Sequence, residues 1–463
     1  MRPSRWFLPA LILGLASPAS ATDIPKNLED LARAYVAAHT GASSGHAVPG
    51  FARQTGLACS ACHYQFLALT PFGRQFKLNG YTLTNQTVIS EQDPSNGGRL
   101  GLSPLSMLSA MLTASVTQTK DGLPDSQNGA AEFPQELSAF LAGRISSNMG
   151  LFAQFTYAGA DGAFGIDNVD VRFAGKTTLG STDMAYGLTL NNNPGVQDLW
   201  NTLPAWGYPF TGSEVAPGGA AAVMLDGGLA QNVLGAGAYA LLGNLVYGEL
   251  TVYRSAFQGA AAPSSATGAI KGVAPYWRLA LQRQFGDQYL MVGTFGMRTS
   301  MFPDMLSGPR DTYTDAGVDA QFESKAGSGN VVVRGSWTHE SQKLDATFAN
   351  GGSDSPKNTL KTLRANASWY PRQWLGLTGG YFTTTGSTDA GLYAPADVEG
   401  SANGSPKTNG FMGELDLNPW ENTRVGLQYT NYSNFNGGKT NYDGMGRNAS
   451  GNNTLFAFVW LAF

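Results

Sequence analysis

Residues 313–323 of the 463-residue chain read Tyr-Thr-Asp-Ala-Gly-Val-Asp-Ala-Gln-Phe-Glu, so that polar and apolar side chains alternate. On an extended strand, Asp315, Asp319 and Glu323 fall on one face, and Val318 and Phe322 fall on the other. Weakly alternating segments of about ten residues, separated by turns, are typical of outer-membrane barrels, although a soluble β-sandwich also alternates. The same pattern recurs from about residue 105 onward, for example in residues 168–173 and 362–370.

The connections between these segments favour the barrel over the sandwich. Short turns and long polar breaks follow one another in strict order, as short periplasmic turns and long external loops would require. When residues 193–232 count as one external excursion, the number of strands is sixteen, whereas an extra strand at residues 220–225 would break the even count. We therefore predict an all-β fold: a transmembrane antiparallel barrel of about 16 strands over residues 105–463, in the lipid of a bacterial outer membrane.

The two chain ends agree with export to that membrane. Residues 1–21 combine Arg2 and Arg5, a short apolar run and Ala19-Ser-Ala21, which is the pattern of a cleaved secretory signal peptide. No later run of apolar residues is long enough for a transmembrane helix. The last strand alternates and ends on Phe463, which resembles the sorting signal of outer-membrane barrels.

Between signal and barrel, residues 22–95 form a small helical and loop segment that contains Cys59-Ser-Ala-Cys62-His63. C-x-x-C-H predicts attachment of one covalent haem c, with thioether bonds to Cys59 and Cys62 and with His63 as proximal iron ligand. A redox C-x-x-C does not need the histidine. A zinc site needs four ligands, and the chain has no further cysteine.

The sixth position on the iron stays open between several residues. The chain has four histidines, and no methionine lies between His63 and Met107. The candidates are His46 (or His39) from the leader, Met107 or Met111 from the first strand, or no ligand at all. Ordinary apolar packing of either methionine is the alternative interpretation. A methionine would raise the haem potential.

Charged and aromatic residues surround the motif. Arg53, Arg74 and Lys77 are candidate partners of the haem propionates, because cations suit carboxylates, or else they are solvated or lumen-facing charges. The aromatic residues are expected to pack around the macrocycle and exclude water; they are Phe51, Phe66, Phe72, Phe76 and Tyr81.

The composition gives no sign of nucleic-acid binding or of a disulfide-stabilised fold. The formal net charge is −4 and charged residues make up 13% of the chain, so no nucleic-acid-binding footprint is visible. Two cysteines, both in the motif, leave no disulfide framework.

The block Phe51-Ala-Arg-Gln-Thr-Gly, then C-x-x-C-H, then Thr70-Pro-Phe-Gly-Arg74-Gln-Phe-Lys77-Leu-Asn-Gly-Tyr81 resembles the fused monohaem cytochrome–porins of the outer membrane. The best-known members are iron oxidases of iron-oxidising bacteria. The resemblance implies an Fe(II)-oxidising oxidoreductase. Extracellular Fe(II) would give an electron to a haem in or under the barrel. A periplasmic soluble cytochrome or copper protein would collect it. Because related chains occur outside iron oxidisers, two alternatives stay open: a conduit for another extracellular donor or acceptor, and a diffusion porin with a haem-bearing plug.

Overall fold

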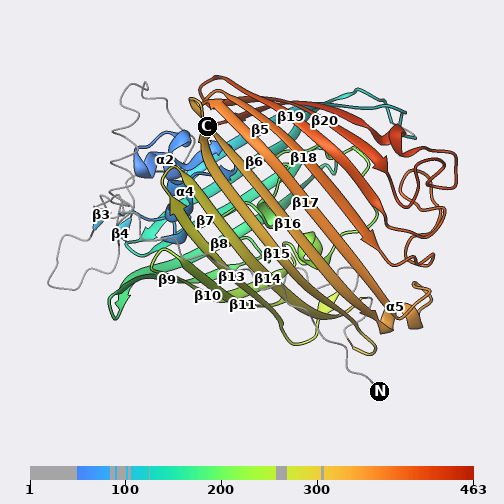
Figure 1. The fold of residues 1–463 in the computed structure, drawn as a ribbon, viewed down its shortest axis with the longest axis horizontal. Helices are drawn as coiled ribbons and strands as arrows, with labels where there is room; N and C mark the ends of the chain where they lie inside the picture. The colour runs from blue at the N-terminus through green and yellow to red at the C-terminus, as the bar shows by residue number, and fades with distance from the viewer. Residues whose placement is uncertain are drawn as a thin grey trace.

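The computed structural model describes residues 50–83, 89–90, 101–102, 106–124, 126–256, 268–303 and 307–463. The predicted signal peptide (1–21), His39 and His46 lie outside these residues. Figure 1 shows a large barrel of tilted strands with a small helical segment at one end. We call residues 50–83 the plug.

The plug and the short strands after it contain α2 (Gly50–Thr55), α3 (Cys59–Cys62), β1 (His63–Gln65), β2 (Ala68–Leu69), α4 (Pro71–Leu78), β3 (Ile89–Ser90) and β4 (Gly101–Leu102). The long barrel strands are β5 (Leu108–Thr119), β6 (Ala131–Ser146), β7 (Met149–Ala158), β8 (Ala163–Leu179), β9 (Thr182–Asn191), β10 (Val233–Leu242), β11 (Val246–Ser255), β13 (Ala274–Phe285), β14 (Gln288–Phe302), β15 (Asp311–Ala326), β16 (Gly329–Leu344), β17 (Lys357–Arg372), β18 (Leu375–Gly386), β19 (Thr408–Trp420), β20 (Thr423–Asn434) and β21 (Thr454–Ala462). The connections hold the two-residue β12 (Ala269–Ile270), the helix α5 (Asp345–Ala349) and three single helical turns (Pro204–Trp206, Met224–Gly228 and Ala449–Asn452). Within the described part of the chain, no helix is long and apolar enough to cross a membrane.

The barrel closes with sixteen long strands in the described residues. Each long strand pairs antiparallel with the next one along the chain, and the last strand, β21, pairs with the first, β5. The closing register places Ala462 opposite Met111 and Trp460 opposite Thr113. No described strand lies within residues 220–225. The predicted all-β barrel and its even strand number are confirmed.

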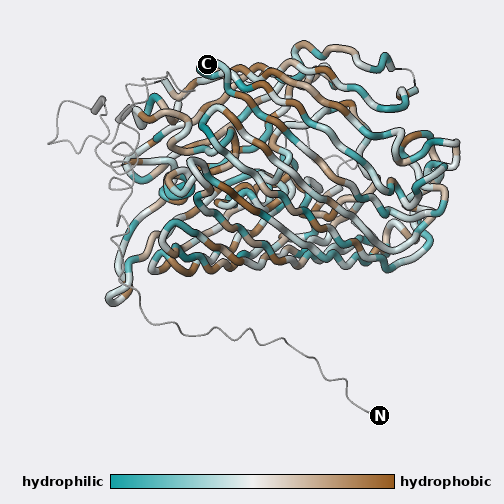
Figure 2. Tube along the Cα trace, turned by 45° about the horizontal axis from the view of Figure 1, so that its top comes forward, coloured by the Kyte–Doolittle hydropathy of each residue, from teal (hydrophilic) through white to brown (hydrophobic). Residues whose placement is uncertain are grey.

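The two faces of the wall have the polarity of a membrane barrel. On β15, Asp319 and Glu323 point into the lumen and are 3% and 5% exposed, while Val318 on the other face is 51% exposed. Figure 2 shows this alternation as teal next to brown along the barrel. A soluble sandwich would bury the apolar face instead. A closed barrel also pairs the backbone groups that lipid cannot satisfy. The protein is therefore an outer-membrane β-barrel.

The two ends of the barrel differ as expected. Ala326 and Gly329 bound a two-residue turn, whereas Gly386 and Thr408 bound a long connection. In Figure 1, α2, α4 and the C terminus lie at one end of the barrel, and α5 lies at the other. The plug contacts the short-turn end, since Gln75 donates to Asn244 in the β10–β11 turn (3.4 Å). Short turns of outer-membrane barrels face the periplasm, so the plug sits at the periplasmic mouth.

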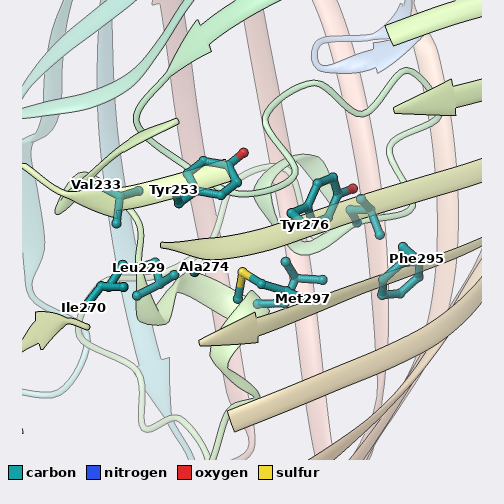
Figure 3. Close-up of a cluster of buried hydrophobic side chains, with 10 residues drawn as sticks. Leu229, Val233, Tyr253, Ile270, Ala274, Tyr276, Phe295 and Met297 are labelled. Atoms are coloured by element: carbon teal, nitrogen blue, oxygen red, sulfur yellow. The ribbon is translucent and has the colours of Figure 1, made fainter. Parts of the chain in front are cut away.

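The connection between β9 and β10 differs from the prediction of an external excursion: it folds into the lumen. Its Asp198 forms a fully buried ion pair with Arg278 of β13 at 2.9 Å, and the backbone carbonyl of Trp200 accepts a hydrogen bond from Arg334 of β16 at 3.2 Å. The buried charges of the wall attract the polar groups of this loop inward, because a buried charge is costly unless it finds a partner. Figure 3 shows part of the core that results, with Leu229 of the connection in one cluster with side chains of the wall.

Candidate functional site

The C-x-x-C-H motif forms one helical turn followed by an extended residue. Cys59 and Cys62 are the two ends of α3, and the backbone N–H of His63 donates to the carbonyl of Cys59. Side chains three apart on a helix lie on the same side, so both thiols face one region with the imidazole next to them. Neither cysteine forms a disulfide, and both are half-buried.

The N-terminal end of helix α4 holds this turn in place through hydrogen bonds. Thr70 caps α4 by accepting from the N–H of Gly73 at 3.2 Å, and Pro71 follows at the first helical position, where it is favoured. The N–H of Thr70 donates to the carbonyl of Cys62 at 2.9 Å, and its hydroxyl donates to the carbonyl of Ala61 at 2.5 Å. The threonine that starts the helix therefore also holds the motif.

Gly73 is required where α4 meets the motif. A Cβ atom at this position would lie 2.2 Å from the carbonyl oxygen of Cys62. We expect Gly73→Ala to push α4 away from α3 and to destabilise the plug by about 1–3 kcal/mol, as overpacking typically does. Urea-dependent protease cleavage within the plug measures this, and haem content should fall with it. Gly122→Ala, which meets open space, is the matched control, and equal behaviour of the two variants would contradict the packing argument.

The motif borders a cavity of about 870 Å³ between the plug and the barrel wall. Cys59, Cys62 and His63 line it, and this volume is in the upper part of the range for cofactor pockets. Alternate residues from Phe152 to the end of β7 form one wall; they are Phe152, Gln154, Thr156 and Ala158. The cavity thus extends from the plug toward the long-loop end of β7.

Aromatic side chains enclose the motif end of the cavity. Phe51 stacks on Tyr81 with ring centroids 5.1 Å apart and meets Phe76 edge-on at 5.2 Å. These three and Phe66 line the cavity, whereas Phe72 is buried behind it with Ala61. The barrel strands add the rings of Phe140, Phe152 and Trp460, and the β9–β10 connection adds those of Trp206 and Phe210.

The imidazole of His63 is held in the form that binds metal. Burial lowers the pKa of His63 to about 4, against a smaller opposing effect of the Leu67 backbone, so the ring is neutral near pH 7. Among the described residues, no well-aligned hydrogen-bond partner meets its buried Nδ1 atom. Two thiols, a neutral imidazole and an aromatic cavity together match the donor set and enclosure that a covalent haem needs. In the described residues, no group of three or more His, Cys, Asp or Glu could hold a metal ion by itself.

The three predicted propionate partners lie in different surroundings. Lys77 lines the cavity, donates to the carbonyl of Asp198 at 2.7 Å and lies over the ring of Trp206. Burial, reinforced by the nearby Arg172, lowers the pKa of Lys77 to about 7. Pairing of Lys77 with a propionate stays a prediction.

Neither of the two arginines lines the cavity. Arg74 forms a buried ion pair with Glu323 of β15, and Arg53 donates to the carbonyl of Leu108 at 2.9 Å. Both arginines therefore tie the plug to the wall in the structure.

Of the two methionines proposed as the sixth ligand, only one lines the cavity. Met111 is buried and lines the cavity, whereas Met107 lies against Gly143 and does not. Although the two methionines are only four positions apart in the sequence, the structure brings only Met111 to the motif. His46 falls outside the described residues.

The contribution of the β9–β10 connection to the site is not predicted from the sequence. Asn201 of this loop accepts from the N–H of Leu69 at 2.9 Å and donates to the carbonyl of Leu67 at 3.0 Å, which fixes the loop against the strand pair after His63. Trp206 and Glu214 of the same loop line the cavity. These contacts join residues more than 130 positions apart, and no local pattern signals them.

Comparison with known proteins finds similar solved structures but no matching family. No protein-family model matches the sequence, and the search of curated proteins finds no match. The structure is similar to a loop L8 deletion mutant of OmpT from Vibrio cholerae (10% identity, TM-score 0.40, 77% of this chain and 98% of that chain). It is also similar to DcaP of Acinetobacter baumannii (12%, 0.45, 77% and 96%) and to a Salmonella typhi OmpF complex with daunomycin (11%, 0.40, 77% and 97%). By its own closed wall and lipid-facing surface, the protein is a porin-like, sixteen-stranded barrel of the bacterial outer membrane.

Proposed function

We propose that the protein is an outer-membrane c-type cytochrome that takes electrons from extracellular Fe(II) through one covalent haem in the barrel mouth and passes them to a periplasmic carrier. The observation that carries the proposal is the shared cavity: Cys59, Cys62 and His63 border one enclosed space with the lumen wall. Cys59 and Cys62 would hold the haem, and His63 would ligate its iron. When bound, the haem supplies a one-electron redox centre.

The position of the cavity suits transfer between the two sides of the membrane. The motif lies on the plug at the short-turn end, where a periplasmic soluble cytochrome or copper protein could approach. The opposite part of the cavity is lined by Asp161, in the four-residue connection between β7 and β8, and by Phe164 near the start of β8. Because the hydrocarbon core is roughly 30 Å thick, a single centre must be approachable from both sides.

Carboxylates at the outer part of the cavity favour a cationic donor. The charged residues that line the cavity are four acids and one base, Lys77 at the plug. A narrow, low-dielectric space lined by one sign of charge raises the local concentration of opposite ions. Fe(II) is such an ion. Electron transfer from Fe(II) to the haem does not require the protein to coordinate the Fe(II). The four acids are Glu136, Asp161, Asp167 and Glu214.

We expect Asp161→Asn with Asp167→Asn to slow haem reduction by Fe(II) about tenfold at low ionic strength, because steering falls with the cavity charge. The difference from wild type should shrink as salt is added. Stopped-flow absorbance measures the rate of haem reduction. The rate of reduction by dithionite, which is an anion, should not fall in the variant. Glu421→Gln in an exposed short turn is the control. An Fe(II) rate that is unchanged in the double variant would contradict the steering argument.

The donor itself is tested by stopped-flow haem absorbance in detergent. Rapid reduction by Fe(II) is the expected result. If only a periplasmic partner reduces the haem, the protein is instead a conduit for another extracellular donor or acceptor.

A diffusion porin with a haem-bearing plug is the second candidate, because barrels with sixteen strands can enclose an aqueous channel. Against it, the plug and the β9–β10 connection both occupy the lumen. Planar-bilayer conductance separates the two functions. A large open-pore conductance with a haem that Fe(II) does not reduce would establish the porin, and a small conductance with rapid reduction would establish the cytochrome.

A further inference from the structure

The first barrel strand presents a methionine to the haem motif. Ser109, Met111 and Thr113 alternate on β5, and all three line the cavity. Met111 is 6% exposed and belongs to an apolar cluster of the wall, against which Cys59 of the motif packs. The wall residues of this cluster are Met111, Phe140, Phe456, Phe458, Trp460 and Ala462.

A continuous set of contacts joins His63 to this part of the wall. The ring centroids of His63 and Phe66 are 5.4 Å apart, and those of Phe66 and Trp460 are 4.5 Å apart. Trp460 lies on β21, whose register places Ala462 directly opposite Met111 on β5. The methionine and the histidine therefore border the same end of the cavity, from the wall and from the plug.

Two other potential iron ligands that line the cavity, Lys77 and Tyr81, have hydrogen-bond partners elsewhere. The Nζ atom of Lys77 donates to the carbonyl of Asp198, and the hydroxyl of Tyr81 donates to Asp170 at 2.7 Å. The thioether of Met111 lies among apolar groups. Met107 is not an equivalent choice, since its side chain lies against Gly143 outside the cavity lining.

We infer that Met111 would supply the sixth ligand of the haem iron, so that the plug and the barrel wall would each provide a ligand to the iron. The inference rests on the proposed function. A thioether opposite histidine raises the reduction potential of a haem. A ligand on a barrel strand is also held more rigidly than one on a loop. The position of the plug in the barrel would then govern the iron ligation.

Met111→Leu tests the inference, with Met107→Leu as the matched control. We expect Met111→Leu to abolish the methionine-to-iron charge-transfer band of the ferric haem, to lower the reduction potential and to allow the ferrous haem to bind carbon monoxide. Met107→Leu should leave all three unchanged. Magnetic circular dichroism, potentiometric titration and gas binding measure these properties. A charge-transfer band that persists in Met111→Leu, or that is absent from the wild type, would overturn the inference.

A second variant guards against a folding defect. Met111→His should keep the iron six-coordinate and give the low-spin spectrum of two nitrogen ligands, which a merely structural residue would not produce. A His/Met spectrum that survives in Met111→His would overturn the assignment. Covalent haem is measured by mass in every variant: its absence from the wild type contradicts the proposed function, whereas its presence with unaltered spectra in Met111→His contradicts only this inference.

Discussion

Serine at both position 59 and position 62 is expected to abolish covalent haem attachment completely. The chain contains no other cysteine, so no thioether can form elsewhere. Intact mass spectrometry of the mature protein and haem staining of denaturing gels measure the result. The wild type should carry one haem, and Cys59→Ser with Cys62→Ser should carry none.

The barrel should survive this substitution. Neither cysteine forms a disulfide and both are half-buried, so serine removes no cross-link and leaves no large cavity. Resistance to heat and to detergent unfolding, measured by gel mobility before and after boiling, is the control. A wild-type protein that carries no covalent haem after export would contradict the assignment of the motif.

Loss of the Arg74–Glu323 ion pair is expected to weaken the free energy of docking of the plug to the barrel wall by about 3–5 kcal/mol, because it leaves a buried charge without its partner. Both side chains are 6% exposed, and Glu323 also accepts a hydrogen bond from Tyr64 at 3.1 Å. Arg74→Ala removes the cation that balances Glu323. Urea titration of protease cleavage in the plug measures the change while the barrel stays folded.

The comparison variant is Arg53→Ala. Arg53 also reaches the wall, but its guanidinium donates to the carbonyl of Leu108 at an exposed site, so its loss should cost less than about 1 kcal/mol. Arg74→Met combined with Glu323→Leu should recover much of the docking energy, since an apolar pair of similar size carries no desolvation cost. Equal effects of Arg74→Ala and Arg53→Ala would show that the buried ion pair does not hold the plug.

The fold was largely predictable because a barrel wall is a local pattern repeated many times. The alternation in residues 313–323 depends only on neighbours in the chain, and the structure places Asp319 and Glu323 in the lumen and Val318 toward lipid. The order of short and long connections then gave the strand number without any tertiary information. The motif was equally local, because Cys59, Cys62 and His63 lie within five residues and form a single turn.

The contents of the lumen could not be predicted in this way. The β9–β10 connection reads as a polar, turn-rich loop, and only Arg278, 80 positions after Asp198, explains why it folds inward. The same limit applies to Arg74. A cation close to the motif suggests a propionate partner, but its carboxylate partner in the structure, Glu323, lies 249 positions away. Pairings of this kind depend on barrel closure, which brings distant strands to face one another.

The position of Met111 shows what the structure adds to a count of candidates. In the sequence, Met107 and Met111 are equivalent, since both are predicted to lie on the first strand. In the structure, β5 begins at Leu108, and only Met111 lies within the alternating part that lines the cavity. The choice between the two depends on where the strand begins, and strand ends are poorly defined by alternation alone.

Electron transfer through the membrane is tested most directly in proteoliposomes that contain trapped ferric cytochrome c and an outward-facing barrel. Fe(II) added outside should reduce the trapped cytochrome c through the wild-type protein and not through Cys59→Ser with Cys62→Ser. Equal reduction by both proteins would show that Fe(II) diffuses through an open pore, and no reduction by either would show that the barrel does not carry electrons from Fe(II); each result would contradict the account.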